Sequence, residues 1–441
     1  MRAFSHHRAR LDVLVTCVWV VALAGMSYLV AKPVRDASLD FYSYYIGASA
    51  IHQGKPVYSP ETHESIAKAE GIENANLYVY LPPVAVLMQP ALLVPPFVAS
   101  LFWFGVNVGL LLVGIGLLFR QSNLRDDGMK VVLLLLPVLF TPVLMTFYLG
   151  QVNILMFVLI TLAYQTFVGR RPYASGILLA LSTWIKIWPI SLIAYFVWKR
   201  EWKVVSGAVV GLLLIGVLTL ALAGVGQTRS FFTDSLPELA RGTEPGLDHL
   251  NQSIPGVFGK LFAPSSSYVR PLLQSPILAQ QGSRVATLLL IVATVFLSSR
   301  PIVLKDRAQF STEFMLVVIA TMLITGRLWE SNLTLLLPAY FLIAEELQRE
   351  HIVPWRQVAL PIASVVLIDM HRIIWTLANP DREPLPWFAL ILPFLGVVLV
   401  WLVFAARRLR EIQSLRIAHL SHPIESAFSA LPASPENAGR R

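Results

Sequence analysis

Residues Phe97–Phe119 read FVASLFWFGVNVGLLLVGIGLLF and contain no charged side chain. A helix of about 20 predominantly apolar residues spans the roughly 30 Å hydrocarbon core of a bilayer, so this stretch predicts a transmembrane helix. Similar apolar runs recur along the chain: Asp12–Ala31, Val131–Phe147, Val152–Val168, Val204–Val225, Val285–Ser298, Phe314–Thr325, Leu333–Leu347, Val358–Trp375 and Trp387–Ala406. The sequence therefore predicts an all-α, polytopic membrane protein.

The composition supports the same class. The chain has 441 residues, of which 56% are hydrophobic and 14% are charged, against roughly 25% charged residues in a soluble protein. The single cysteine, Cys17, excludes an intrachain disulfide framework and a cysteine-based zinc site. We attribute the formal net charge of +9 to membrane orientation, and we expect no nucleic-acid partner.

Basic clusters set the expected topology. They lie at Met1–Arg10, Arg120–Lys130, Arg170–Arg171, Lys199–Lys203, Arg300–Arg307, Arg349–Arg356 and Arg407–Arg410, and the positive-inside rule assigns all of them to the cytoplasm. The apolar stretch Ala174–Trp198 has a basic cluster on each side and carries Lys186 and Pro189 near its middle. We therefore predict a re-entrant hairpin that turns near Lys186–Pro189. The total is about twelve helical passes with both termini cytoplasmic.

Two long connections are expected on the outer face, about 32–96 and 226–284. The predicted organisation is a cytoplasmic N-terminus (1–11), one integral-membrane domain (12–406) and a disordered cytoplasmic tail (407–441). The first apolar run is too long for the apolar region of a signal peptide, so we expect a retained anchor.

Within the first outer connection, residues 38–54 read SLDFYSYYIGASAIHQG and predict a short helix. Ser38 is a candidate N-cap, and Gly54 is a candidate glycine just past the helix end. The density of aromatic residues suggests a helix lying in the membrane interface, with Asp40 and Tyr44 on one face. The prolines between Tyr80 and Pro96 predict broken structure rather than a straight span.

Two glycine pairs fit the pattern of closely packed membrane helices. Gly105 and Gly109 lie four residues apart, as do Gly207 and Gly211. Small residues at this spacing let two helix backbones approach each other. The pattern is common and indicates packing rather than function.

Several motifs occur together in a fixed order. They are Asp40, Tyr44-Tyr45, Gly54 and Tyr58; Tyr80-Leu81-Pro82-Pro83; Gly150-Gln151-Val152-Asn153; Gly176 and Lys186-Ile187-Trp188-Pro189; Lys199–Lys203; Asn251-Gln252-Ser253; and Trp329-Glu330-Ser331-Asn332 with Pro338. In this order the sequence, from about Asp12 to Trp401, resembles glycosyltransferase family 87 of the GT-C superfamily. Many members of that family carry histidines after the Trp-acid pair, where this chain has Ser331 and Asn332.

The resemblance implies a GT-C-like bundle and a membrane-embedded enzyme with its site at the outer face. Such an enzyme transfers a hexose from a polyprenyl-phosphate carrier to a lipid-linked or glycan acceptor, usually with inversion. The resemblance is to the polyprenyl-phosphate-mannose-dependent type, for which the hexose is mannose. It also implies a plasma-membrane location and a lipid-linked sugar donor. The sequence has no Asp-x-Asp motif, no histidine pair four residues apart and no glycine-rich phosphate loop, so we expect no cofactor or metal. Asp40 matches the position of the family's general base.

The candidate site residues follow from chemistry as well as resemblance. Asp40 needs only an ionised carboxylate within reach of an acceptor hydroxyl, although an acid near a helix start also complements the helix dipole. Lys186, with Arg327 and Arg372, is a candidate for the lipid phosphate; Lys186 could instead snorkel to the interface. Candidates for contacting acceptor and sugar are Tyr44, Gln151, Asn251 and Gln252, although belt, capping and helix-packing roles explain such residues equally well.

Other interpretations remain open at this stage. Asp36 is a second candidate base, and a metal at Asp40 would need Asp36 or Glu61 as a further ligand. Arg327 and Glu330 could form an ordinary surface pair. Asn251-Gln252-Ser253 and Asn332-Leu333-Thr334 match the glycosylation sequon. A transporter or lipid flippase, and an inactive scaffold of glycan assembly, are the alternative functions.

Overall fold

A computed structural model describes residues 2–31, 38–241, 248–266, 268–302, 307–349, 355–378 and 384–429. Its elements are α1 (Arg2–Ala31), α2 (Leu39–His52), α3 (Pro60–Ala69), α4 (Pro82–Leu87), η1 (Gln89–Leu93), α5 (Pro96–Gln121), α6 (Asp127–Leu139), α7 (Thr141–Leu149), α8 (Asn153–Val168), α9 (Pro172–Ile185), α10 (Ile190–Trp198), α11 (Trp202–Ala223), α12 (Val225–Ser230), η2 (Phe231–Ser235), α13 (Leu236–Arg241), η3 (Asp248–Leu250), α14 (Ile254–Phe262), β1 (Val269–Arg270), η4 (Leu278–Gly282), α15 (Ser283–Leu297), α16 (Arg307–Ile324), η5 (Glu330–Leu336), α17 (Leu337–Leu347), α18 (Trp355–Ala378), β2 (Leu385–Pro386), α19 (Trp387–Leu390) and α20 (Leu392–Ser429). The only sheet in these ranges is the parallel pair β1–β2.

The predicted class, an all-α polytopic membrane protein, is confirmed. Among the described residues, seven helical segments are long and apolar enough to cross a bilayer: Pro96–Gln121, Asp127–Leu149, Trp202–Ala223, Leu278–Leu297, Arg307–Ile324, Gln357–Leu377 and Leu392–Ser414. Shorter apolar helices run over Val13–Tyr28, Pro82–Leu93, Asn153–Val168 and Pro172–Ile185. The count of about twelve passes stays a prediction.

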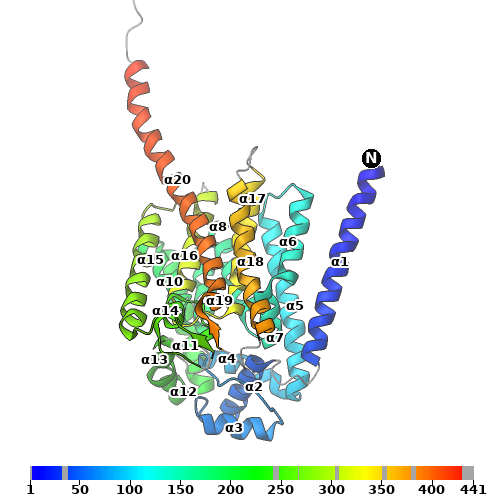
Figure 1. Ribbon diagram of the computed structural model, residues 1–441. Helices are drawn as coiled ribbons and strands as arrows, with labels where there is room; N and C mark the ends of the chain where they lie inside the picture. Colours follow the sequence, from blue (N-terminus) through cyan, green and yellow to red (C-terminus); the bar gives the residue numbers. More distant parts are fainter. Residues whose placement is uncertain are drawn as a thin grey trace, which may run out of the picture.

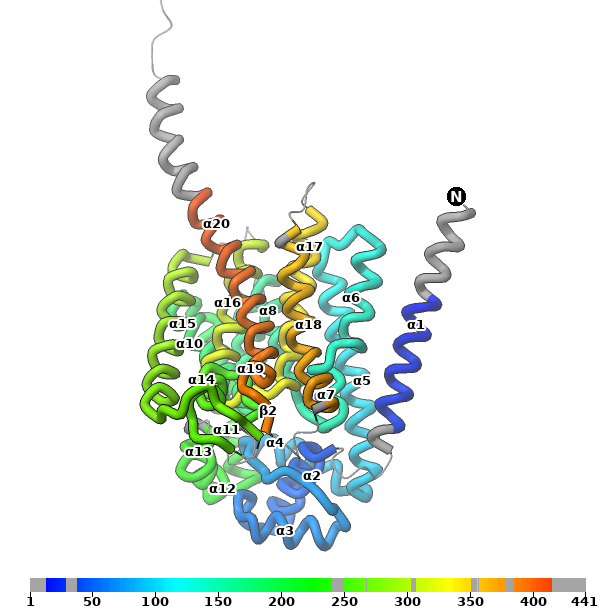
Figure 2. Tube along the Cα trace, viewed as in Figure 1, coloured from blue at the N-terminus to red at the C-terminus, as the bar shows by residue number. Residues whose placement is uncertain are grey.

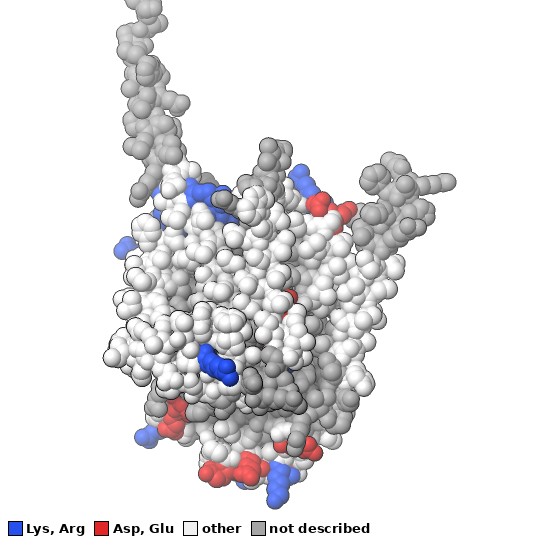
Figure 3. Space-filling view, viewed as in Figure 1, with Lys and Arg blue, Asp and Glu red and all other residues white. Residues whose placement is uncertain are grey.

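The helices run between two ends of the bundle. The start of α1 and the end of α20 lie at one end, and α2, α3, α12 and α13 lie at the other (Figure 1). The chain trace shows α1 standing beside α5 and α6 at the margin of the bundle (Figure 2). On the face shown in Figure 3, most charged side chains gather near the two ends and the band between them is largely uncharged. Large apolar side chains such as Leu213, Leu214 and Val217 of α11 are exposed, as lipid-facing residues are.

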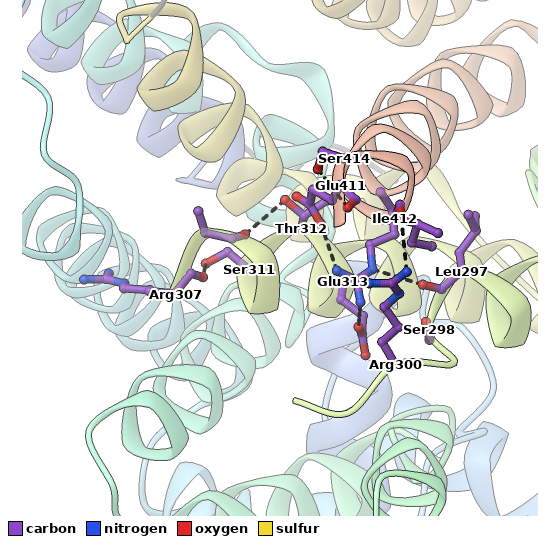
Figure 4. Close-up of polar contacts among 12 residues, drawn as sticks. Leu297, Ser298, Arg300, Arg307, Ser311, Thr312, Glu313, Glu411, Ile412 and Ser414 are labelled. Carbon is purple, nitrogen blue, oxygen red and sulfur yellow. Dashed lines mark hydrogen bonds and ion pairs between the residues drawn. The ribbon is translucent and has the colours of Figure 1, made fainter. Parts of the chain in front are cut away.

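Several predicted basic clusters meet at the end of the bundle where α20 leaves. Glu313 of α16 pairs with Arg408 of α20 at 2.6 Å and with Lys199 at 2.5 Å, and Tyr195 donates a hydrogen bond to the same carboxylate. Lys199 also donates to the carbonyls of Ser298 and Arg300. Figure 4 shows Glu313 among residues of α15, α16 and α20. The prediction that these clusters share one face agrees with these contacts; which side of the membrane they occupy stays a prediction.

The predicted helical hairpin is present as α9 and α10, with the break at residues 186–189. Lys186, in the break, contacts Asn153 at the start of α8. By contrast, Ser175 near the start of α9 bonds to Ala163, and the ring of Phe196 near the end of α10 lies 5.0 Å from that of Phe167. The start of α9 and the end of α10 therefore lie beside the same end of α8, so the chain folds back on itself.

Glycines bring α9 and α11 together, but only one of the two predicted pairs behaves this way. A Cβ on Gly207 would overlap the carbonyl of Tyr173, and one on Gly211 would overlap Ala180. Around Gly105 and Gly109 of α5 there is open space. The spacing pattern predicted a close helix contact correctly in α11 and wrongly in α5. The pattern does not show which face of a helix meets a neighbouring helix.

Of three expectations at the ends of elements, two need correction. Ser38 is not a side-chain cap: it has a φ of 61° and makes no capping hydrogen bond, and its N–H donates to the carbonyl of Tyr148. Gly54 does adopt the left-handed conformation, with φ 65°. The expected disordered tail from residue 407 begins as helix, since α20 continues to Ser429 and Arg408 pairs with Glu411 one turn later. Residues 430–441 lie outside the described ranges.

Helix α2 lies inside the protein rather than presenting its aromatic rings to lipid. Its residues from Asp40 to Ala50 are buried except Tyr42, and Tyr44 and Tyr45 are 0% and 3% exposed. A Cβ on Gly47 would overlap the ring of Tyr78. The aromatic residues read from the sequence as an interfacial belt are instead packing residues around Asp40.

Candidate functional site

Asp40 lies at the start of α2, buried and hydrogen-bonded on both oxygens. It is 1% exposed; Asn76 Nδ2 donates to Oδ1 at 3.0 Å and Gln151 Nε2 donates to Oδ2 at 2.5 Å. Burial raises the pKa of this carboxyl, while the two amides and the charge of Lys186 oppose the shift. A carboxylate with a raised pKa is better matched to accepting a proton near neutral pH than an ordinary aspartate.

The turn between α7 and α8 brings Gln151 to Asp40. Gly150 has a φ of 68°, a conformation in which glycine carries no side-chain penalty, and a Cβ there would overlap Phe41. The Gly150 carbonyl accepts a hydrogen bond from Trp103 Nε1 at 2.7 Å. The turn is therefore fixed from two sides, with Gln151 directed at the carboxylate.

Hydrogen bonds continue from Gln151 to a lysine. Asn153 Nδ2 donates to Gln151 Oε1 at 2.8 Å. Lys186 Nζ donates to Asn153 Oδ1 at 2.6 Å, to Asn332 Oδ1 at 2.8 Å and, more weakly, to Gln151 Oε1 at 3.4 Å. We call Asp40, Asn76, Gln151, Asn153, Lys186 and Asn332 the Asp40 network. It joins an anion to a cation through neutral amides, so neither charge is buried without partners.

Aromatic side chains enclose this network. The rings of Tyr44 and Tyr80 meet edge to face with centroids 4.8 Å apart, and Lys186 Nζ lies 5.8 Å from the centre of the Tyr80 ring. The Tyr80 carbonyl accepts a hydrogen bond from the Tyr58 hydroxyl at 2.8 Å. The Tyr80 ring thus adds a cation–π contact to Lys186. Tyr44 is fully buried, which favours packing over direct contact with a sugar.

Lys186 lines a cavity beside the Asp40 network. The Lys186 cavity has a volume of about 260 Å³. Its lining is mainly apolar and aromatic and includes two cations, Lys186 and Arg327. The lining residues are Val79, Tyr80, Leu81, Ile185, Lys186, Ile187, Trp188, Phe231, Leu236, Leu239, Thr325, Gly326, Arg327, Trp329 and Asn332. An apolar cavity with two cations suits an amphipathic anion.

A second cavity is lined by Arg372, the third cation predicted to bind phosphate. The Glu330 cavity measures about 280 Å³ and is lined by Leu39, Met145, Tyr148, Leu149, Leu250, Trp329, Glu330, Ser331, Arg372 and Trp375. Arg372 therefore does not join Lys186 and Arg327 in one cavity. Trp329 borders both.

Asn251 and Gln252 hold backbone instead of facing a cavity. Asn251 Nδ2 donates to the Gly326 carbonyl at 2.8 Å, and its Oδ1 accepts from the Leu328 N–H at 2.9 Å. Gln252 Nε2 donates to the Leu390 carbonyl at 3.2 Å. The Asn251 amide thus fixes the segment that carries Arg327, and the Gln252 amide is bonded to the end of α19. These contacts favour a positioning role over sugar contact.

Other sequence candidates lie apart from the network or outside the described ranges. Glu61 is exposed on α3 and accepts a hydrogen bond from Ser59, and Asp36 is outside the described ranges. Within those ranges no group of three His, Cys, Asp or Glu residues is placed to hold a metal ion. Sequence reasoning missed Asn76 altogether, since a lone asparagine in a long connection carries no motif.

Comparison with known proteins gives two findings. The model of "Glycosyltransferase family 87" matches residues 78–329, which include Gln151, Lys186 and Arg327 but not Asp40. A polyprenol-phosphate-mannose-dependent alpha-(1-2)-phosphatidylinositol pentamannoside mannosyltransferase of Mycolicibacterium smegmatis is 27% identical over 240 residues, 53% of this chain and 55% of the relative. The matched segment thus spans about half the length of that relative. The family match covers more than half of the chain, and the protein belongs to glycosyltransferase family 87.

Proposed function

We propose that this membrane glycosyltransferase moves a hexose, mannose by analogy with the relative, from a polyprenyl-phosphate sugar to a lipid-linked or glycan acceptor. The observation that carries the proposal is the continuity from Asp40 through Gln151 to Lys186, which lines a largely apolar cavity beside Arg327. A nucleotide-sugar enzyme needs polar contacts for a base and a ribose. An isoprenoid phosphate needs an apolar wall and cations, and the Lys186 cavity has both.

The proposed reaction assigns one task to each group. An acceptor hydroxyl oxygen bonds to the anomeric carbon of the sugar while Asp40 takes the hydroxyl proton. The bond between the anomeric carbon and the phosphate oxygen breaks, and its electron pair leaves with the lipid phosphate. Lys186 and Arg327 stabilise the negative charge that develops there. Inversion at the anomeric carbon follows if attack and departure occur on opposite faces of the sugar.

We place the reaction at the outer face of the plasma membrane. Helices α2, which contains Asp40, and α3 lie at the end of the bundle opposite the end where α20 leaves (Figure 1). The basic cluster of Lys199, Arg300 and Arg408 packs against α20, at that second end. The positive-inside rule makes the basic end cytoplasmic. Reporter fusions at the C-terminus and in the 226–284 connection test this orientation, and a cytoplasmic 226–284 connection would contradict it.

The direct test of the function is transfer of label by the purified protein in liposomes containing a lipid extract of the source cells. We expect transfer from radiolabelled polyprenyl-phosphate-mannose and none from GDP-mannose. Transfer from the nucleotide sugar alone would overturn the assignment of the donor. Movement of the lipid-linked sugar across the bilayer without any transfer would favour a flippase, and neither movement nor transfer would favour a scaffold.

A further inference from the structure

Two residues that line the Glu330 cavity carry buried polar atoms with no hydrogen-bond partner among the described residues. Glu330 is 7% exposed and Ser331 is 1% exposed, and both line the cavity. Within the described part of the chain, Glu330 Oε1 and Ser331 Oγ accept and donate no hydrogen bond. Leaving a buried polar atom in this state is unfavourable. Because both residues line the cavity, a rotation of their side chains toward it would let a ligand supply the missing hydrogen bonds.

We propose that the Glu330 cavity binds the hydroxyl-bearing terminal sugar of the acceptor, with Glu330 and Ser331 as its hydrogen-bonding partners. This inference rests on the proposed function, because it divides donor and acceptor between the two cavities. The wall of the cavity fits the assignment. An ionised glutamate accepts hydrogen bonds from hydroxyls, a serine both donates and accepts, and Arg372 adds donors at the same wall.

His371 stands behind the glutamate. Its Nδ1 lies 3.9 Å from Glu330 Oε2, beyond hydrogen-bonding distance, and neither ring nitrogen has a hydrogen-bond partner among the described residues. His371 is 3% exposed and does not line the cavity. A small rotation of Glu330 toward a bound hydroxyl would give its carboxylate a hydrogen-bond partner. A small rotation of His371 toward Glu330 would bring the two side chains within hydrogen-bonding distance. We therefore assign His371 as a positioning residue.

The size and walls of the cavity suit one sugar unit. Its volume of about 280 Å³ falls at the lower end of small-molecule sites, which hold about 300–1,000 Å³. Tyr148, Trp329 and Trp375 contribute aromatic surface to its lining, on which the apolar face of a sugar ring can pack. An isoprenoid chain is a poorer occupant, because it would leave Glu330 and Ser331 unpaired.

The placement relative to Asp40 also fits an acceptor. Leu39, the residue before Asp40, lines the Glu330 cavity, whereas Lys186, joined to Asp40 through Gln151, lines the other. Two neighbouring residues of η5 also line different cavities: Ser331 lines the Glu330 cavity and Asn332 lines the Lys186 cavity. Asp40 is thus next in sequence to a residue of the Glu330 cavity and two hydrogen bonds from Lys186, so we assign the acceptor hydroxyl to the Glu330 cavity and the leaving phosphate to the Lys186 cavity.

The test separates binding from catalysis by using radiolabelled octyl mannoside as a probe of the Glu330 cavity. We compare wild type with Glu330→Gln, which keeps the shape of the side chain, with Ser331→Ala, and with Lys186→Met as the control for the other cavity. We expect Glu330→Gln to weaken probe binding by about tenfold or more, Ser331→Ala to weaken it less, and Lys186→Met to leave it unchanged. In transfer assays the KM for the acceptor rises in Glu330→Gln while the KM for the donor does not.

Two results would overturn the inference: wild type that binds no octyl mannoside, or folded Glu330→Gln protein that binds it within twofold of wild type. The KM and kcat values together identify the role of His371. A folded His371→Gln variant that raises the KM for the acceptor, with little change in kcat and in the KM for the donor and with Glu330 intact, supports positioning. If wild type binds the probe but transfers no sugar, the proposed function fails while the binding site stands.

Discussion

Replacing Lys186 by methionine separates the catalytic contribution of its charge from its structural contribution. The ammonium makes two short hydrogen bonds, to Asn153 and Asn332, and a weaker one to Gln151. Hydrogen bonds to a charged group contribute about 1.5–3 kcal/mol each. Removing the charge also removes the cost of desolvating it, which is several kcal/mol for a buried ion. These contributions oppose each other, so we expect the free energy of unfolding to change by no more than about 2 kcal/mol.

The expected loss in catalysis is larger because nothing offsets it. One preorganised group that stabilises developing charge is typically worth about 10²–10³-fold in kcat. We expect Lys186→Met to lower kcat for transfer by that factor while thermal unfolding in detergent shifts only slightly. Lys203→Met is the matched control, since Lys203 is an exposed lysine at the start of α11. Folded Lys186→Met with transfer within threefold of wild type would refute the assignment of Lys186 to the leaving phosphate.

Three further predictions concern pH, charge and packing. Because burial raises the pKa of Asp40 above its ordinary value of 3.8 and only the carboxylate accepts a proton, kcat/KM should fall as the pH decreases through that raised pKa; a profile flat down to pH 3.8 would contradict this. Glu313→Ala removes the carboxylate that two buried cations, Lys199 and Arg408, share, and Arg408 keeps only its pair with Glu411; the change should cost about 3–5 kcal/mol of unfolding free energy. Asp127→Ala, which breaks an exposed pair, should cost less than about 1 kcal/mol, and equal melting temperatures would argue against the difference. Gly207→Ala forces α9 and α11 apart and should cost about 1–3 kcal/mol, whereas Gly105→Ala meets open space and should melt like wild type.

The helices were predictable because hydrophobicity in a membrane protein is a one-dimensional signal. A run long enough to span the bilayer must satisfy its backbone internally, and only a helix does so within one segment. The break at residues 186–189 was predictable for a related reason, since a lysine and a proline within an apolar stretch oppose a continuous span. The helix that continues after Ala406 was not predictable from the sequence, because ion pairs with α16 and within α20 stabilise it.

The site was only partly predictable because its contacts join distant segments. Asp40, Gln151 and Lys186 were candidates from chemistry and resemblance, and the structure brings them together. Asn76 and Asn332 complete the network, yet each reaches it through tertiary packing that leaves no local pattern. Asn332 stands where many family members carry a histidine, and its side-chain oxygen accepts from Lys186. The difference from those members at position 332 therefore changes a residue that contacts Lys186, the proposed phosphate-binding lysine, rather than a residue at the surface.

Asn251 and Gln252 show a different limit. Polar residues in an outer connection of a glycosyltransferase suggest sugar contact, but the same amides can satisfy backbone groups of an irregular segment. Here Asn251 bonds to Gly326 and Leu328. Composition cannot distinguish an amide that faces a cavity from one that faces backbone.

The most direct test of the account is sugar transfer from radiolabelled polyprenyl-phosphate-mannose by wild type and by Asp40→Asn, with Asp127→Asn as the exposed control. General bases typically contribute about 10²–10⁴-fold to rate. We predict transfer by wild type and by Asp127→Asn, and a loss of that size in Asp40→Asn protein that is folded and still binds the donor. Transfer by folded Asp40→Asn at nearly the wild-type rate would contradict the assignment of Asp40 as the base.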